Sequence, residues 1–250
     1  MFPRAFSAWA ALLCAAALSS SPANGTDRLA LREIVQNDCV ADWLSRHDPS
    51  PCVQVVLTDP RGAQGYALLA DRKGGAHFLL IPVQDIPGIE SPLLAQAGAA
   101  NYFALAWEAR GLLAGRIGRP VPRGIVGLAV NPPRSRSQDQ LHIHLECMSA
   151  PVVAALAGAS GRLGGGWTPL YVGGARFEAR RLLGEHLEQN PFEILANDIP
   201  EAGRTPADYT LLLAGRQFPG GPGFVLLAGT ERAAELLMDS SCAAAAPERS

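Results

Sequence analysis

The segment Gln140-Leu141-His142-Ile143-His144 constrains the fold of this chain more than any other part of the sequence. Its polar and apolar residues alternate, and this period of two is typical of a β-strand with one buried face. On such a strand Gln140, His142 and His144 share one face, with same-face neighbours about 7 Å apart. The sequence therefore predicts a strand over residues 140–147 that turns an amide and two imidazoles toward one site.

The composition describes a globular protein without a general affinity for nucleic acid. Of the 250 residues, 48% are hydrophobic and 18% are charged, which provides enough apolar material for a sizeable core. The formal net charge is −2, so the chain has no broad basic field for nucleic acid. Any contact with a phosphate group must come from a few local side chains.

The N-terminus has the pattern of a secretory signal. Arg4 is followed by an apolar stretch, residues 8–18, and then by the small residues 19–23. We expect residues 1–24 to be a signal peptide or an N-terminal membrane anchor, and residues 25–250 to form a single domain. The apolar stretch is shorter than the roughly 20 residues of a comfortable membrane span, which favours cleavage and leaves an uncleaved anchor open.

Four cysteines lie after this leader: Cys39, Cys52, Cys147 and Cys242. An even number of cysteines in an exported chain indicates disulfides, and three pairings are possible. We favour Cys39–Cys52, which closes a short proline-rich loop, and Cys147–Cys242, which ties the tail to the end of the 140–147 strand. Four buried thiols are the alternative.

Helix and strand patterns alternate along the chain. Helical spacing of apolar residues predicts helices over residues 27–39, 101–115, 151–163 and 177–189. Alternation and turn residues predict a hairpin from 65–70 and 77–82, a strand over 124–130, and a second hairpin from 209–215 and 224–229. The expected fold class is α+β, a mostly antiparallel β-sheet with packed helices.

The polar face of the 140–147 strand suits chemistry on a phosphoanhydride. Negative oxygens repel most nucleophiles from such a bond, but a neutral imidazole escapes that repulsion and can attack phosphorus. Its second ring nitrogen should donate to a carbonyl or carboxylate, which fixes the tautomer. A neighbouring His or Gln can donate to the non-bridging oxygens, and a protonated His can give a proton to the leaving group.

Metal binding is the alternative chemistry of a His-x-His strand. A zinc site would need a third ligand beside the two histidines, and the candidates are Glu146, His77 and His186. We expect no metal, because Gln140 is a poor zinc ligand and the sequence has no second cluster of metal-binding residues. Surface or structural roles are expected for His77 and His186.

The loop before the strand adds groups that suit a phosphate. It supplies two cations and three neutral polar side chains: Asn131, Arg134, Arg136, Ser137 and Gln138. Arginine binds phosphate through two parallel hydrogen bonds, so we expect this loop to contact a substrate. A solvated loop is the alternative for both arginines.

These residues resemble a known family. Gln140-Leu141-His142-Ile143-His144-Leu145 is similar to the histidine-triad motif of nucleotide hydrolases and transferases, with glutamine in place of the first histidine. The leader, the four cysteines and four segments (residues 50–52, 88–94, 101–110 and 120–122) resemble, in this order, the bacterial CDP-diacylglycerol pyrophosphatases. The resemblance covers nearly all of the chain after the leader.

The resemblance implies a histidine-triad-like catalytic domain that hydrolyses CDP-diacylglycerol to CMP and phosphatidate. His142, at the middle triad position, would attack phosphorus and form a cytidylyl-histidine, and His144 would orient the site or contact the leaving group. Gln140 can donate a hydrogen bond but cannot carry a proton. Ser137 lies where related nucleotidyltransferases place a phosphate-contacting serine. Neither chemical step formally needs a metal, and we expect no cofactor.

Such an enzyme would meet its lipid substrate at the inner membrane surface, facing the periplasm, or would be periplasmic if the leader is cleaved. Phe103, Trp107 and the loop 82–92 are candidates for an apolar landing surface. Two other functions remain open. One is a related hydrolase or nucleotidyltransferase that acts on another nucleotide diphosphate, and the other is an exported metal-binding protein.

Overall fold

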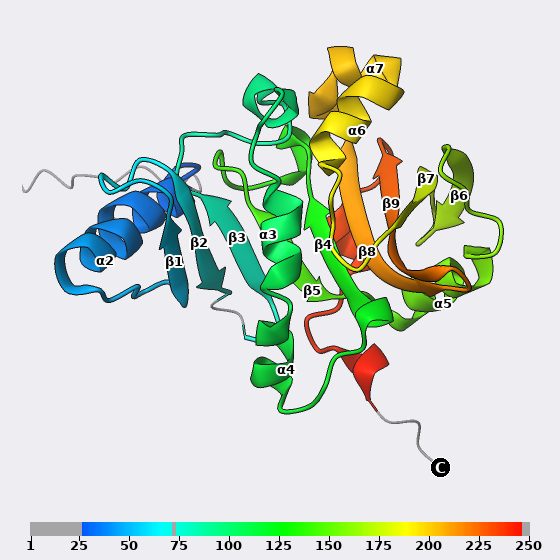
Figure 1. Cartoon of the computed structure of the whole chain (residues 1–250), viewed down its shortest axis with the longest axis horizontal. Helices are drawn as coiled ribbons and strands as arrows, with labels where there is room; N and C mark the ends of the chain where they lie inside the picture. Colours follow the sequence, from blue (N-terminus) through cyan, green and yellow to red (C-terminus); the bar gives the residue numbers. More distant parts are fainter. Residues whose placement is uncertain (1–26, 72–73, 247–250) are drawn as a thin grey trace, which may run out of the picture.

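A computed structural model describes residues 27–71 and 74–246, and a nine-stranded antiparallel sheet organises this part of the chain (Figure 1). In spatial order the strands are β1 (Gln54–Leu57), β2 (Gly65–Ala70), β3 (Phe78–Pro82), β5 (Ile143–Cys147), β4 (Val126–Val130), β8 (Thr210–Phe218), β9 (Gly221–Gly229), β7 (Ala175–Leu183) and β6 (Thr168–Val172). The predicted α+β class with an antiparallel sheet is confirmed.

Helices pack on both faces of this sheet. They are α1 (Ala30–Glu33), α2 (Ala41–Arg46), α3 (Tyr102–Glu108), α4 (Gly111–Ile117), α5 (Ala150–Ala159), α6 (Pro191–Asp198) and α7 (Pro200–Arg204), and a π-helical stretch, Ile34–Val40, joins α1 to α2. Figure 1 shows α3 across the front of the sheet near its centre and α2 beside the β1 edge.

Both predicted hairpins are confirmed. β2 has the predicted bounds and pairs with β3 in a register that places Leu68 opposite Leu80. β8 and β9 form the second hairpin and are longer than predicted. The paired strands β4 and β5 lie between the two hairpins and join them into one sheet.

The predicted helix over residues 177–189 is wrong. Much of this segment belongs to β7, which pairs with β6 on one side and β9 on the other. Phe177 and Ala179 are buried and the charged residues next to them are more exposed, which is the period of two of a strand. The adjacent leucines Leu182 and Leu183 interrupt this alternation and give the sequence a helix-like spacing.

Other predicted elements form with different bounds. The first helical segment continues past the predicted end at Cys39 as far as Arg46. The predicted 101–115 helix is divided into α3 and α4. β5 begins at Ile143, three residues later than predicted, because the backbone N–H of Leu141 donates to Ile86 in a loop at 2.6 Å.

The two faces of the sheet differ in what covers them. One face packs against α3 and α6 in a large core that contains Leu80 and Leu128. The opposite face carries two smaller cores. One lies between β1–β3 and the N-terminal helical segment, around Ile81, and the other lies between β7–β9 and α5, around Leu212. Between these cores, β5 turns the polar side chains of His144 and Glu146 outward, and His77 lies directly before β3.

The predicted apolar landing surface is wrong. Phe103 and Trp107 are fully buried in the large core, and three hydrophobic residues of the loop 82–92 are buried as well: Val83, Ile86 and Ile89. The predicted leader, residues 1–24, lies outside the described residues. In the described ranges, none of the helices combines the length and the apolar character needed to cross a bilayer.

Both favoured disulfides form. Cys39 pairs with Cys52, and Cys147 pairs with Cys242. The second disulfide ties the end of β5 to the C-terminal segment. It therefore holds the strand that carries the histidines against residues 95 positions away in the sequence.

Candidate active site

The strand histidines lie in a cavity of about 540 Å³ between the two smaller cores. The start of α1 and the facing ends of β2 and β3 give this cavity an aliphatic wall, and residues 135–138 give it a polar wall. His142 and His144 lie at its floor, with ring centroids 5.1 Å apart. A 3-10 turn, Ala234–Leu237, supplies Glu235 at the edge.

His142 is held so that one ring nitrogen is free to react. Its Nδ1 lies 2.7 Å from the backbone oxygen of Gln140 and must carry a proton to donate there. This carbonyl fixes the tautomer and leaves a lone pair on Nε2. Burial lowers the pKa of His142, and the positive field of Arg136 and His77 lowers it further, so the ring is neutral near pH 7.

A hydrogen-bonded chain connects His144 to a carboxylate through His77. Nδ1 of His77 lies 2.9 Å from Oδ2 of Asp71, and Nε2 of His77 lies 3.0 Å from Nδ1 of His144. The far nitrogen of His144, Nε2, lies 3.2 Å from a carboxylate oxygen of Glu235. Because each ring has two nitrogens, this chain can pass a proton from His77 to His144 while neither ring moves.

The alignment of the two rings is that of a direct hydrogen bond. The planes of His77 and His144 differ by 11°, and their centroids are 5.2 Å apart. The distance between the ring centroids exceeds the 3.0 Å between Nε2 of His77 and Nδ1 of His144 by nearly the sum of the two ring radii. Both nitrogens therefore lie close to the line that joins the ring centres. An N–H···N bond prefers such a linear arrangement.

Glu146 lies next to His77 and carries a protonated carboxyl group at neutral pH. Its Oε1 is 3.1 Å from Nε2 of His77. Burial raises the pKa of Glu146 to about 8, and repulsion from Glu235, Asp71 and Asp239 adds to the effect. At neutral pH the protonated form therefore prevails, which removes a negative charge from beside His77.

His77, His144 and Glu146 also form a cluster that could hold a metal ion. Each offers one ligand atom, and these atoms lie within 4.8 Å of one another. On a tetrahedral ion, however, the lone pairs of two imidazoles converge at an angle. The nearly linear arrangement of the two ring nitrogens fits the hydrogen-bonded chain better than a shared ion.

The side chain of Gln140 is engaged with the protein. Its Nε2 donates to the backbone oxygens of Pro82 and Gln84, both at 2.8 Å, and its Oε1 accepts from Nε of Arg32 at 3.2 Å. The residue is only 1% exposed. Gln140 thus holds the loop after β3 in place, and its backbone oxygen, not its amide, contacts the ring of His142.

Arg136 lies at the cavity and is paired with two carboxylates. It donates to Glu90 at 2.7 and 2.5 Å and to Asp139 at 3.2 Å. Arg28 binds Asp139 as well, and hydrogen bonds from Arg28 and then Arg136 lower the pKa of Asp139 to about 2. This network fastens the polar loop to the residues just before α1.

The other predicted phosphate-binding residues fall into two groups. Ser137 and Gln138 line the cavity. Arg134 and Asn131 are not among the described residues of its wall. Arg134 donates to two backbone carbonyls elsewhere, and buried Asn131 accepts from the backbone of Glu235 at 3.4 Å. The loop therefore brings Arg136, Ser137 and Gln138 to the histidine cavity, whereas Asn131 lines a separate small gap beside His142.

The sequence analysis considered His77 only as a third metal ligand or a surface or structural residue, and it did not place His77 against His144. Its position next to His144 follows from the register of β3 and β5, which places Leu79 opposite His144. No local pattern fixes that register. His186, the other histidine considered as a third ligand, lies at the surface beside Glu108 at 3.1 Å.

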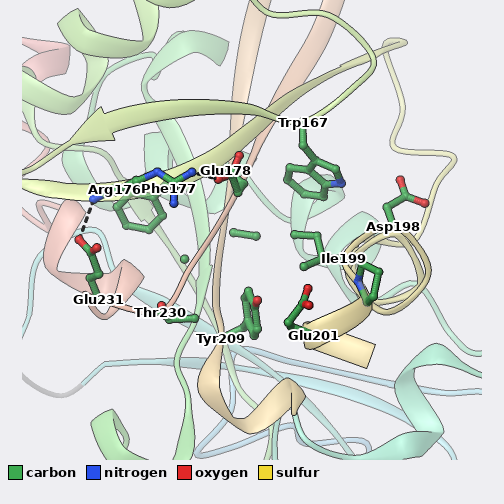
Figure 2. Close-up of a pocket in the computed structure, with 13 residues that line it drawn as sticks. Trp167, Arg176, Phe177, Glu178, Asp198, Ile199, Glu201, Tyr209, Thr230 and Glu231 are labelled. Carbon is green, nitrogen blue, oxygen red and sulfur yellow. Dashed lines mark hydrogen bonds and ion pairs between the residues drawn. The ribbon is translucent and has the colours of Figure 1, made fainter. Parts of the chain in front are cut away.

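A second cavity, of about 380 Å³, lies near β7 and α7 (Figure 2). Trp167 and Tyr209 face it from opposite sides, together with the carboxylates of Glu178 and Glu201. These carboxylates would repel an anionic ligand, and the described residues of its wall include no histidine, cysteine or serine. The histidine cavity is therefore the candidate active site.

Comparisons with known proteins identify the family of the chain. The family model of CDP-diacylglycerol pyrophosphatase matches residues 26–246 of the chain. The chain is also 38% identical over 223 residues to a CDP-diacylglycerol pyrophosphatase of Yersinia pestis. That match covers 85% of this chain and 83% of the relative.

Proposed function

The chain belongs to the CDP-diacylglycerol pyrophosphatase family, and on this basis we propose that it hydrolyses the pyrophosphate bond of CDP-diacylglycerol to CMP and phosphatidate. The observation that carries the mechanism is the state of His142. It is a neutral imidazole with Nδ1 bound to a carbonyl, and it lies at the floor of a cavity that a phosphate group can enter. Such a ring is a nucleophile that an anionic substrate does not repel.

In the first step, the lone pair on Nε2 of His142 attacks the cytidylyl phosphorus. A P–N bond forms, the P–O bond to phosphatidate breaks, and the leaving oxygen takes the proton from Nε2 of His144. His77 begins the cycle doubly protonated, with its positive charge stabilised by Asp71, and it replaces that proton at Nδ1 of His144, which leaves His77 neutral. The carbonyl of Gln140 stabilises the positive charge that develops on the attacking ring.

In the second step, a water molecule attacks the same phosphorus. Its proton passes to Nε2 of His144, and the proton on Nδ1 of His144 returns to His77. The P–N bond breaks, CMP leaves, and the lone pair returns to His142. Each histidine ends the cycle in its starting protonation state, so the protons balance over both steps.

We assign contact and positioning roles by what each polar side chain already bonds. Ser137 is exposed in the cavity and contacts a non-bridging phosphate oxygen. Gln140, Arg136 and Gln138 position the loop and the nucleophile, because their polar atoms are bound to other protein groups. Arg134 stabilises the loop through backbone carbonyls.

The protein acts outside the cytoplasm in this proposal. Two disulfides and the leader pattern are typical of an exported chain. Residues 25–250 act as a single catalytic domain at the periplasm-facing surface of the inner membrane.

A substrate panel tests the proposed function. Purified protein is incubated separately with CDP-diacylglycerol, a CDP-alcohol without acyl chains, and a dinucleoside polyphosphate, and nucleotide release is measured. We expect the fastest release, as CMP, from CDP-diacylglycerol, and its loss in His142→Ala. A preference for the dinucleotide would support a related hydrolase of soluble nucleotides instead.

The second candidate function is metal binding, which the cluster of His77, His144 and Glu146 favours. Elemental analysis of the purified protein separates the two. One zinc per chain, lost in His77→Ala, would favour the metal-binding function. A content far below one per chain, with full pyrophosphatase activity, would support the hydrogen-bonded chain.

A further inference from the structure

The cavity that holds the histidines has a mixed wall. Its aliphatic side consists of residues from α1, the π-helical stretch and the strands: Ala30, Leu31, Ile34, Leu69, Ala70 and Leu79. Its opposite side carries the histidines and the polar loop. An amphiphile with a charged head and an apolar body fits such a wall, whereas a soluble nucleotide has no apolar chain that would pack against the aliphatic side.

The size of the cavity limits how much of a lipid it can enclose. Its volume of about 540 Å³ lies within the roughly 300–1,000 Å³ that suits a drug-sized ligand. A nucleotide diphosphate with the adjoining glycerol fills such a space. Two long acyl chains do not fit in addition, so they must remain outside the protein while the pyrophosphate reaches His142.

Two exposed leucines are sequence neighbours of residues that line the cavity. Leu29 directly precedes the lining residue Ala30 and is 43% exposed. Leu236 directly follows Glu235 at the edge of the cavity and is 58% exposed. One lies before α1 and the other in the 3-10 turn, so two separate segments beside the cavity each carry an exposed leucine.

The start of the chain adds an independent argument. The apolar stretch of the leader ends at Leu18, nine residues before Asp27, and α1 begins shortly after, at Ala30. Nine extended residues reach about 30 Å at most. When the leader is in a bilayer, it therefore keeps the α1 side of the cavity close to the membrane.

Resting on the proposed function, we infer that the mouth of this cavity is the membrane-docking surface of the protein. Leu29 and Leu236 enter the bilayer surface, the diacylglycerol part of the substrate leaves the bilayer only along the aliphatic wall, and the acyl chains stay among the lipids. The bilayer is the one partner that supplies both the substrate and the apolar medium for these leucines.

The test compares two forms of the substrate. Full-length protein is assayed on CDP-diacylglycerol in phosphatidylcholine vesicles and on a short-chain CDP-diacylglycerol dissolved as monomers. The variants are Leu29→Ser/Leu236→Ser, and Leu183→Ser as a matched control, because Leu183 is also 58% exposed but lies on β7. We expect the double variant to need about tenfold more vesicles for half-maximal rate, since it loses two apolar contacts with lipid. Its rate on the monomeric substrate should stay within about twofold of the wild type.

The other outcomes are equally clear. An unchanged vesicle requirement in the double variant, or an equal shift in Leu183→Ser, would overturn the docking surface. No wild-type activity on either substrate would instead refute the proposed function.

Leu236→Trp tests the docking surface without loss of apolar surface. It should retain vesicle binding, and its added fluorescence should be quenched by lipids brominated on their acyl chains; no quenching would contradict the inference.

Discussion

Substitution of His77 by alanine tests the proton chain most sharply. The change removes the donor to Asp71 and the partner of Nδ1 of His144 while the nucleophile stays in place. A hydrogen bond to a charged group contributes about 1.5–3 kcal/mol, and about 1.4 kcal/mol corresponds to a tenfold change in rate. We therefore expect His77→Ala to lower kcat on CDP-diacylglycerol by about ten- to a hundredfold, less than loss of His142 itself.

The assay must separate proton transfer from a general loss of structure. The p-nitrophenyl ester of CMP has a leaving group that needs no proton, so the first step in His77→Ala, followed as the initial burst of p-nitrophenol, should proceed at close to the wild-type rate. His186→Ala is the matched control, since His186 also pairs with a carboxylate at 3.1 Å but is exposed. Equal losses on both substrates would show that His77 serves only the fold and would refute the reasoning.

Three further predictions concern charge, covalent links and the polar loop. Burial lowers the pKa of His142, so kcat/KM on a soluble substrate should fall to half at a pH below the ordinary imidazole value of about 6.5; a midpoint above it would contradict a buried neutral nucleophile. Cys242→Ser should lower the free energy of unfolding in urea by about 2–5 kcal/mol because it removes the link to Cys147, and an unchanged midpoint would count against this. Glu90→Gln should cost about 1–3 kcal/mol in the same assay, because the nearly buried Arg136 loses its closest carboxylate partner; a loss no larger than that of an exposed ion pair would be evidence against the network.

Local patterns were enough to predict the parts of this structure that depend on near neighbours. The alternation from Gln140 to His144 predicted a strand, and the part from Ile143 onward is one. Turn residues predicted the hairpin of β2 and β3 with correct bounds for β2. A charged strand with two adjacent leucines was misread as a helix, because periods of 2 and 3.6 are hard to separate over so few residues.

The parts of the site that depend on distant residues were not predictable. His77 meets His144 only because β3 and β5 pair in one register, across 67 positions of sequence. The amide of Gln140 is occupied because the loop after β3 returns to it, a contact that no local pattern specifies. The ion pair of Arg136 with Glu90 joins residues 46 positions apart, so it was not visible in the sequence. Phosphate binding was therefore the only role that the sequence suggested for Arg136.

The central claim is that Nε2 of His142 becomes bonded to the cytidylyl phosphorus. CDP-diacylglycerol labelled at that phosphorus is mixed with the protein, the reaction is quenched in base within one turnover, and the labelled peptide is identified. The account predicts an acid-labile label on His142 that is retained longer in variants slowed in the second step. Label on another residue, or none while CMP is released at the full rate, would contradict it.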